Sequence, residues 1–84
     1  MEHLKIGVFF SDKGKWNFLP ETSQMLSEKN IIPVHGDRIT TIGEDFKLMN
    51  LESIGDFKSV VTVKERLHRY VNCDLAVICE HQNW

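Results

Sequence analysis

The chain has 84 residues, of which 42% are hydrophobic and 26% are charged, and its formal net charge is −2. This composition is typical of one soluble globular domain and excludes a disordered chain. The apolar runs are far shorter than the roughly 20 residues that cross a bilayer, so we expect no membrane partner. Ten basic residues are mixed with twelve acidic ones. Because a duplex-binding protein needs a concentrated basic face, we expect no nucleic acid partner.

The N-terminus and the cysteines indicate a cytoplasmic location. Charged residues stand at Glu2, Lys5 and Asp12, which is not the pattern of a signal peptide. Cys73 and Cys79 bracket an apolar run, and an extended strand would hold their Cα atoms about 20 Å apart, far beyond the roughly 7 Å limit for a disulfide. Two free thiols are typical of a reducing compartment.

Two continuous apolar runs, over 5–10 and 74–79, carry the strongest structural signal. Such runs are typical of strands buried on both faces, as in the middle of a parallel sheet. Each run ends abruptly in polar residues, and in open α/β sheets ligands bind at the carboxyl ends of such strands. The pattern predicts two neighbouring parallel strands with polar side chains at one end.

The segment after the first run predicts a loop, a helix and a strand. Residues 11–17 have the composition of a loop. Pro20 suits the first turn of a helix and apolar residues follow at helical spacing, so we expect a helix over about 19–29 that ends at Asn30. Residues 31–34 predict a short parallel strand at a sheet edge, because the proline within it cannot donate to a ladder.

The middle of the chain has a weaker signal. Residues 39–42 and 46–48, with Gly43 between them, predict a hairpin, and one helical turn around 48–51 is an alternative. The apolar residues over 59–71 recur at helical spacing after a serine that suits an N-cap. We therefore expect a second helix there, with a charged outer face.

Together these elements predict one α/β domain over residues 1–84, with a small sheet of three to five strands and two helices. Its parallel core would have the strand order 2-1-3, which places 5–10 between 31–34 and 74–79. The crossover between the first two strands should be right-handed.

The carboxyl ends of the first and last strands form a candidate ligand site. Its polar residues are Ser11, Asp12, Lys13, Lys15, Glu80 and His81. A hydroxyl, two lysines and a flexible glycine before a helix N-terminus suit a nucleotide or a sugar phosphate, although their spacing matches neither glycine-rich phosphate signature. Asp12 and Glu80 could also share acid and base roles at this edge. A plain solvated loop is the simpler interpretation, and we assign no catalytic residue.

The cysteines and histidines predict no metal site. Cys79 and His81 would point to the same side of an extended strand. A structural zinc ion normally takes four ligands in tight local pairs, so this single loose pair leads us to predict no metal and no cofactor. At the end of an apolar run, Cys79 is expected to be buried and unreactive.

Two tryptophans, Trp16 and Trp84, fall outside the predicted core elements. Tryptophan and arginine dominate the binding energy of many protein interfaces. Trp16 and Trp84 are therefore candidate interface anchors, and Arg66 and Arg69 on the predicted second helix are candidate rim residues. The alternative is that either tryptophan folds back to seal a small core.

Several short segments resemble the small nucleoside 2-deoxyribosyltransferase-like proteins, a group found often in phage genomes. These segments are 5–10 leading to Asn17-Phe18, then 26–33, and Cys73-Asp74 opening an apolar strand. The chain lacks the further helix and the carboxylate motif that such enzymes place after that strand. The resemblance implies a truncated Rossmann-like sheet that keeps a ligand crevice and has lost the chemistry.

From these observations we expect a small cytoplasmic module that binds another protein, as a regulator or inhibitor, without catalysis of its own. The alternative is a binding domain for a nucleotide or sugar phosphate at the strand ends, and a minimal enzyme using Asp12 and Glu80 is a third reading. A homodimer is a further alternative, because a chain that ends on a central strand can complete its sheet with a second copy.

Overall fold

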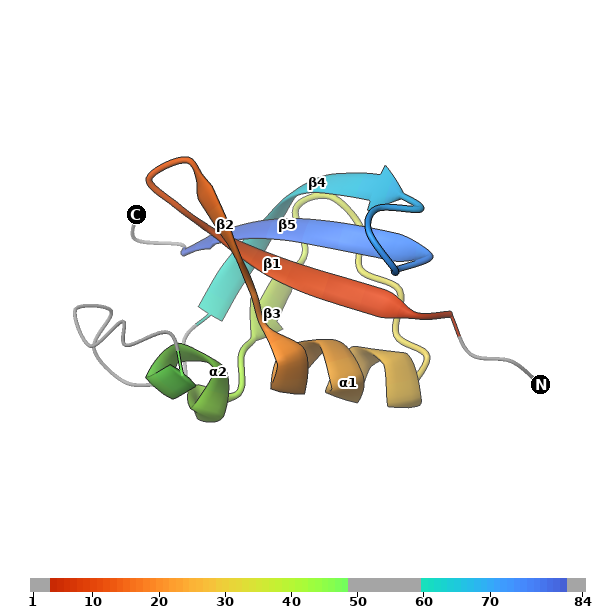
Figure 1. Ribbon diagram of the computed structural model, residues 1–84, viewed down its shortest axis with the longest axis horizontal. Coiled ribbons are helices and arrows are strands. Elements are labelled where there is room, and N and C mark those ends of the chain that lie inside the picture. The colour runs from red at the N-terminus through yellow and green to blue at the C-terminus, as the bar shows by residue number, and fades with distance from the viewer. Residues whose placement is uncertain (1–3, 49–59, 82–84) are drawn as a thin grey trace.

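A computed structural model describes residues 4–48 and 60–81 of the chain (Figure 1). It contains a five-stranded mixed sheet with the order β2-β1-β5-β4-β3, in which only β1 and β5 are parallel. Both helices lie on one side of this sheet (Figure 1). The elements are β1 (Ile6–Asp12), β2 (Lys15–Phe18), α1 (Pro20–Glu28), β3 (Arg38–Thr40), α2 (Gly43–Leu48), β4 (Val60–His68) and β5 (Leu75–His81). Within these residues, no helix is long and apolar enough to cross a membrane.

The predicted parallel pairing of the two apolar runs is confirmed. β1 and β5 are hydrogen-bonded neighbours, with a register that runs from Ile6 opposite Leu75 to Phe10 opposite Cys79. Alternate residues of β5 face the two sides of the sheet, and all five from Leu75 to Cys79 are buried. This two-sided burial explains why the run is apolar without alternation.

The first helix is also confirmed, and α1 begins at Pro20 as predicted. Pro20 needs no hydrogen-bond partner in the first turn, and Asn30 adopts the left-handed conformation after the helix, with φ of 52°. Leu26 is buried against the sheet and Met25 packs at the margin of the core. The core on this side is formed by Ile6, Val8, Phe10, Leu19, Leu26, Ile39, Phe46, Val61, Val63, Leu75, Val77 and Cys79.

The predicted parallel core with the order 2-1-3 is wrong, because two elements differ from the expectation. Residues 31–34 form no strand, and Pro33 is buried within an irregular segment. The place beside β1 is taken by β2, whose residues 15–17 belong to the predicted 11–17 loop. Lys13 and Gly14 join β1 to β2 with φ of 52° and 81°, the left-handed pair of a tight hairpin turn.

The predicted helix over 59–71 is also wrong, because 60–68 form the strand β4, which is antiparallel to both of its neighbours, β5 and β3. Residues 60–63 are β-branched, which favours a strand. A bulge between Val63 and Glu65 then shifts the register against β5. The extra residue changes which side chains share a face, so apolar residues recur at spacings that also fit a helix.

The predicted hairpin over 39–42 and 46–48 is wrong, although a strand does form at the start of its first segment. Its first strand overlaps β3, in which Ile39 lies opposite Val61. The second segment is helical and belongs to α2. The alternative helical turn around 48–51 lies outside the described residues, except for residue 48 at the end of α2. The serine proposed to cap the second helix also lies outside them.

A close approach of the backbone to Cys73 requires the glycine at position 7. Gly7 lies in β1 opposite Ala76, so two of the smallest residues meet at the centre of the sheet. A Cβ added at Gly7 would overlap the Sγ of Cys73. In the observed packing, the Cys73 side chain occupies the space that a side chain at position 7 would need.

Candidate protein-binding face

The predicted ligand-site residues are brought to one end of the sheet, although they come from different elements. The parallel register ends at Phe10 opposite Cys79, so the next residues of both strands, which include Asp12 and Glu80, lie at the same sheet end. Lys13 and Lys15 belong to the exposed β1–β2 hairpin. The Oδ1 atom of Asp12 is buried and has no hydrogen-bond partner within the described part of the chain.

The N-terminus of α1, which the sequence offers to a phosphate, already holds an internal carboxylate. Leu19 at the N-cap provides no side-chain hydrogen bond. Instead, the fully buried Asp45 of α2 accepts hydrogen bonds from the Glu21 N–H at 2.8 Å and the Thr22 N–H at 2.9 Å. The Thr22 hydroxyl donates to the same carboxylate. This helix end is therefore used to join α1 to α2, and the geometry gives no support to a phosphate there.

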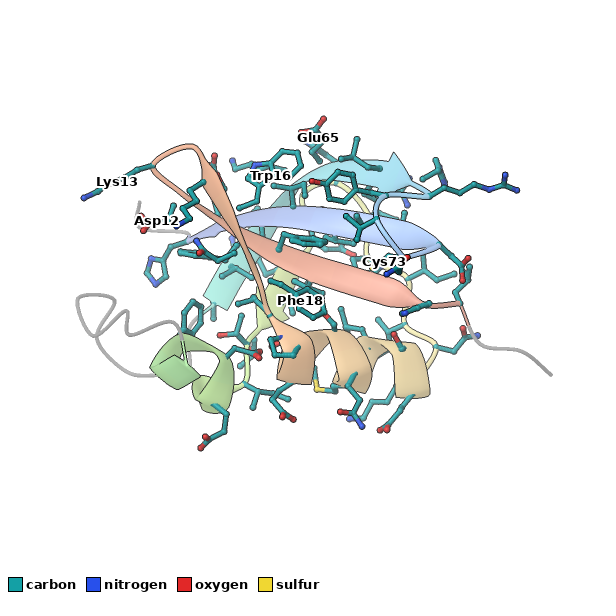
Figure 2. All side chains as sticks on the ribbon, in the orientation of Figure 1. Asp12, Lys13, Trp16, Phe18, Glu65 and Cys73 are labelled. Carbon is teal, nitrogen blue, oxygen red and sulfur yellow. The ribbon has the colours of Figure 1, made fainter. Side chains whose placement is uncertain are left out.

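Four aromatic side chains gather on the side of the sheet that faces away from the helices. We call Phe9, Trp16, Phe18 and Tyr70 the aromatic face. The ring centroids are 5.3 Å apart for Phe9 and Phe18, 5.6 Å for Phe9 and Tyr70, and 5.7 Å for Trp16 and Tyr70. Figure 2 shows Trp16 projecting from the side of the sheet opposite α1. Each ring is thus held by a neighbouring ring, which limits its freedom to reorient.

The aromatic face is partly open to solvent. Trp16 is 38% exposed and Phe18 is 47% exposed, and both belong to the edge strand β2. On the same side of the sheet, the β5 residues Ala76 and Ile78 are buried. The central strand is therefore covered, whereas the two outer rings remain accessible.

Acidic residues flank the aromatic face. Glu65 of β4 lies opposite Ile78, and Glu80 of β5 lies opposite Thr62, which places both carboxylates on the helix-free side. Figure 2 shows Glu65 on that side. An apolar centre with a charged margin is the usual anatomy of a protein interface.

The arginines proposed as a rim have different surroundings. The bulge in β4 turns Arg66 toward the helix side, where its Nη1 donates to the Pro33 carbonyl at 3.2 Å. Arg69 is exposed in the turn before β5, with φ of 54°, and its N–H donates to the Asp74 carbonyl. The structure therefore separates Arg66 from Trp16. Trp84 lies outside the described residues.

Phe9, Phe18 and Tyr70 were missed as site residues. The signal for two of them is present in the sequence, since reading Lys13-Gly14 as a hairpin turn places Phe9 opposite Phe18. Tyr70 falls within the predicted helix over 59–71, which does not form. Its role depends on the turn between β4 and β5.

The two cysteines are free and differ in their surroundings. Cys79 is buried, and burial raises the pKa of its thiol from 9.0 to about 12. The thiolate is the reactive form, so this burial agrees with the expected unreactivity of Cys79. Cys73 is only partly buried. No group of three or more potential metal ligands occurs within residues 4–48 and 60–81.

We expect iodoacetamide at pH 8 to modify the native protein at Cys73 and to leave Cys79 unmodified until the chain unfolds. At that pH the buried thiol stays protonated, and its sulfur is also inaccessible. Intact-mass spectrometry with and without urea measures the number of adducts, and Cys73→Ser is the matched control that should show none when folded. Rapid labelling of Cys79 in the folded control would contradict the burial.

Comparisons with known proteins give no match, whether the chain is scanned against protein-family models or searched against curated proteins and solved structures. The resemblance to nucleoside 2-deoxyribosyltransferase-like proteins stays a prediction from its short segments.

Proposed function

We propose that this chain is a protein-binding module that contacts its partner through the aromatic face and acts as a regulator or inhibitor without catalysis of its own. The observation that carries the proposal is the exposure of Trp16 and Phe18 beside Phe9 and Tyr70. Large aromatic side chains at the centre of an interface provide much of its binding energy. Rings that are already packed against one another lose little freedom on binding, which favours affinity.

The geometry favours this function over nucleotide or sugar-phosphate binding. The α1 N-terminus is occupied by Asp45, and the buried atom at the sheet end that has no hydrogen-bond partner among residues 4–48 and 60–81 is a carboxylate oxygen of Asp12. An ionised carboxylate accepts hydrogen bonds and repels a phosphate. The hairpin of β1 and β2 also takes the place of the flexible loop on which the phosphate interpretation depended.

We expect Trp16→Ala and Phe18→Ala to leave the fold intact and to weaken partner binding at least thirtyfold, about 2 kcal/mol, as for interface hot spots. Affinity purification from the source cells identifies a partner of the wild-type protein, and calorimetry then measures its affinity for each variant. Ile32→Ala is the matched control, because Ile32 is equally exposed but lies outside the aromatic face.

Two results would overturn this proposal. One is unfolding of both Trp16→Ala and Phe18→Ala, as seen by circular dichroism, which would assign these rings to the core. The other is a partner that binds the two variants and the Ile32→Ala control with equal affinity.

A further inference from the structure

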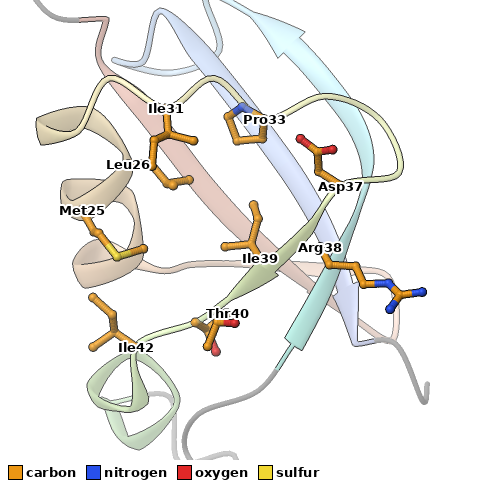
Figure 3. A pocket seen from close by; sticks show the side chains of 10 residues that line it. Met25, Leu26, Ile31, Pro33, Asp37, Arg38, Ile39, Thr40 and Ile42 are labelled. Atoms are coloured by element: carbon orange, nitrogen blue, oxygen red, sulfur yellow. The ribbon is translucent and has the colours of Figure 1, made fainter.

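A groove lies between α1 and the edge strand β3. β3 is at the opposite edge of the sheet from β2, which carries Trp16 and Phe18 of the aromatic face. Its volume is about 450 Å³. Met25 and Leu26 of α1 form one wall, and Ile39 of β3 forms the opposite wall, with Ile31 and Ile42 at the two ends (Figure 3). A volume of this size can hold one or two aliphatic side chains.

Among residues 4–48 and 60–81, no further strand pairs with β3 along this groove. The Val63 N–H donates to the Asp37 carbonyl at 2.8 Å, and the Val63 carbonyl accepts from the Gly36 N–H at 2.9 Å, so Gly36 and Asp37 together lie opposite Val63 in a bulge. Hydrogen-bonded pairs alternate along an antiparallel ladder, and after this bulge the next one is Ile39 opposite Val61. The N–H and C=O groups of Arg38 and Thr40 therefore point away from β4, toward the sheet edge beside which no strand lies in the described part of the chain.

The free edge and the groove together define the geometry of an occupant. An extended chain can bond to the open main-chain groups of β3, and every second side chain would then lie on the Ile39 side. That side is the apolar groove. An aliphatic residue of the added strand therefore meets Met25, Leu26 and Ile39.

Arg38 adds a charge requirement on the other side of the strand. It lies opposite Thr62, and Figure 3 shows its side chain extending away from α1. Its guanidinium has no ion-pair or hydrogen-bond partner in residues 4–48 and 60–81. A residue directly across from Arg38 in an added strand would have its Cβ atom about 5 Å away, so a carboxylate there complements it.

We propose that β3 binds an extended peptide segment of another protein, which adds to the sheet as a strand, places an aliphatic side chain in the groove and sets an acidic residue beside Arg38. The site is independent of the aromatic face, because β3 and β2 are the opposite edges of the sheet. If no peptide binds to β3, the proposed function of the aromatic face is unaffected.

The test uses a fluorescein-labelled heptapeptide of alternating valine and glutamate, with fluorescence anisotropy to measure binding. We expect Thr40→Pro to weaken binding at least tenfold, because proline removes an outward N–H without breaking the ladder to β4. Thr40→Val is the matched control and should bind within twofold of the wild type. Arg38→Glu should abolish binding of the glutamate peptide and raise the affinity for the same peptide with lysines in place of glutamates.

Amide hydrogen exchange provides a second readout. The N–H groups of Arg38 and Thr40 should exchange at least tenfold more slowly when the peptide is bound. Absence of peptide binding, equal binding by Thr40→Pro, or no charge dependence at position 38 would each overturn the proposal. A wild-type dimer that Thr40→Pro converts to a monomer would also overturn it, because the edge would then pair with a second copy of this chain.

Discussion

Replacing Phe46 by alanine is expected to lower the free energy of unfolding by about 4 kcal/mol, the usual range for a fully buried phenylalanine. Phe46 of α2 has no exposed surface, and it belongs to the core. Its ring packs edge-on against Phe10 of β1, with centroids 5.3 Å apart and planes at 90°. The truncation therefore loses apolar burial, leaves a cavity and removes an aromatic pair.

Urea unfolding followed by circular dichroism measures this loss. Phe18→Ala is the matched control, because it makes the same truncation at a ring that is 47% exposed, and it should cost less than about 1 kcal/mol. Phe46→Leu keeps most of the side-chain volume, so its loss of unfolding free energy should lie between those of Phe46→Ala and Phe18→Ala. This variant can still be measured if Phe46→Ala does not fold. Equal losses for the alanine variants at positions 46 and 18 would contradict the core role of Phe46.

Replacing Asp45 by alanine is expected to lower the free energy of unfolding by about 3 kcal/mol, because hydrogen bonds to a charged group contribute roughly 1.5–3 kcal/mol each and do not add fully. The substitution leaves the Glu21 and Thr22 N–H groups without their acceptor. It also removes the acceptor of the Thr22 hydroxyl, which itself accepts from the Ile42 N–H at 3.0 Å. The loss therefore affects the start of α1 and the approach to α2 together.

Glu44→Ala provides the control for Asp45, since Glu44 is the neighbouring acidic residue of α2 and is exposed. We expect it to change the unfolding free energy by less than about 0.5 kcal/mol. In Asp45→Ala, the amide protons of Glu21 and Thr22 should exchange faster than in the wild type, measured by NMR. Unchanged exchange at those two amides would show that the carboxylate does not cap α1.

Much of the local structure could be predicted because its causes are local. The apolar runs predict β1 and β5, Pro20 marks the start of α1, and Asn30 supplies the left-handed residue after it. Each of these features depends on a few adjacent residues. The same holds for Trp16, which is predicted to be an interface residue because it is a large aromatic side chain outside the predicted core elements.

The remaining elements depend on contacts between distant segments. Val63 and Leu67 fit one face of a helix by spacing, yet the bulge in β4 places them on opposite faces of the sheet. Nothing in the residues around Asp45 predicts that its carboxylate is buried. Its hydrogen-bond donors, the N–H groups of Glu21 and Thr22, lie 24 and 23 positions earlier in the chain. Tyr70 joins Trp16 only because β4 and β5 bring the turn between them over β1.

The sequence by itself determined an α/β domain with two neighbouring parallel strands, a helix that begins at a proline, and a tryptophan outside the core elements. Only the tertiary structure decided that 60–68 is a strand, that β2 takes the place predicted for 31–34, and that four rings form one face. The physical reason is that the spacing of apolar residues indicates which residues become buried. The choice between helix and strand in 60–68 depends instead on the ladder of hydrogen bonds between β4 and β5. That ladder joins separate segments of the chain, so no local pattern contains it.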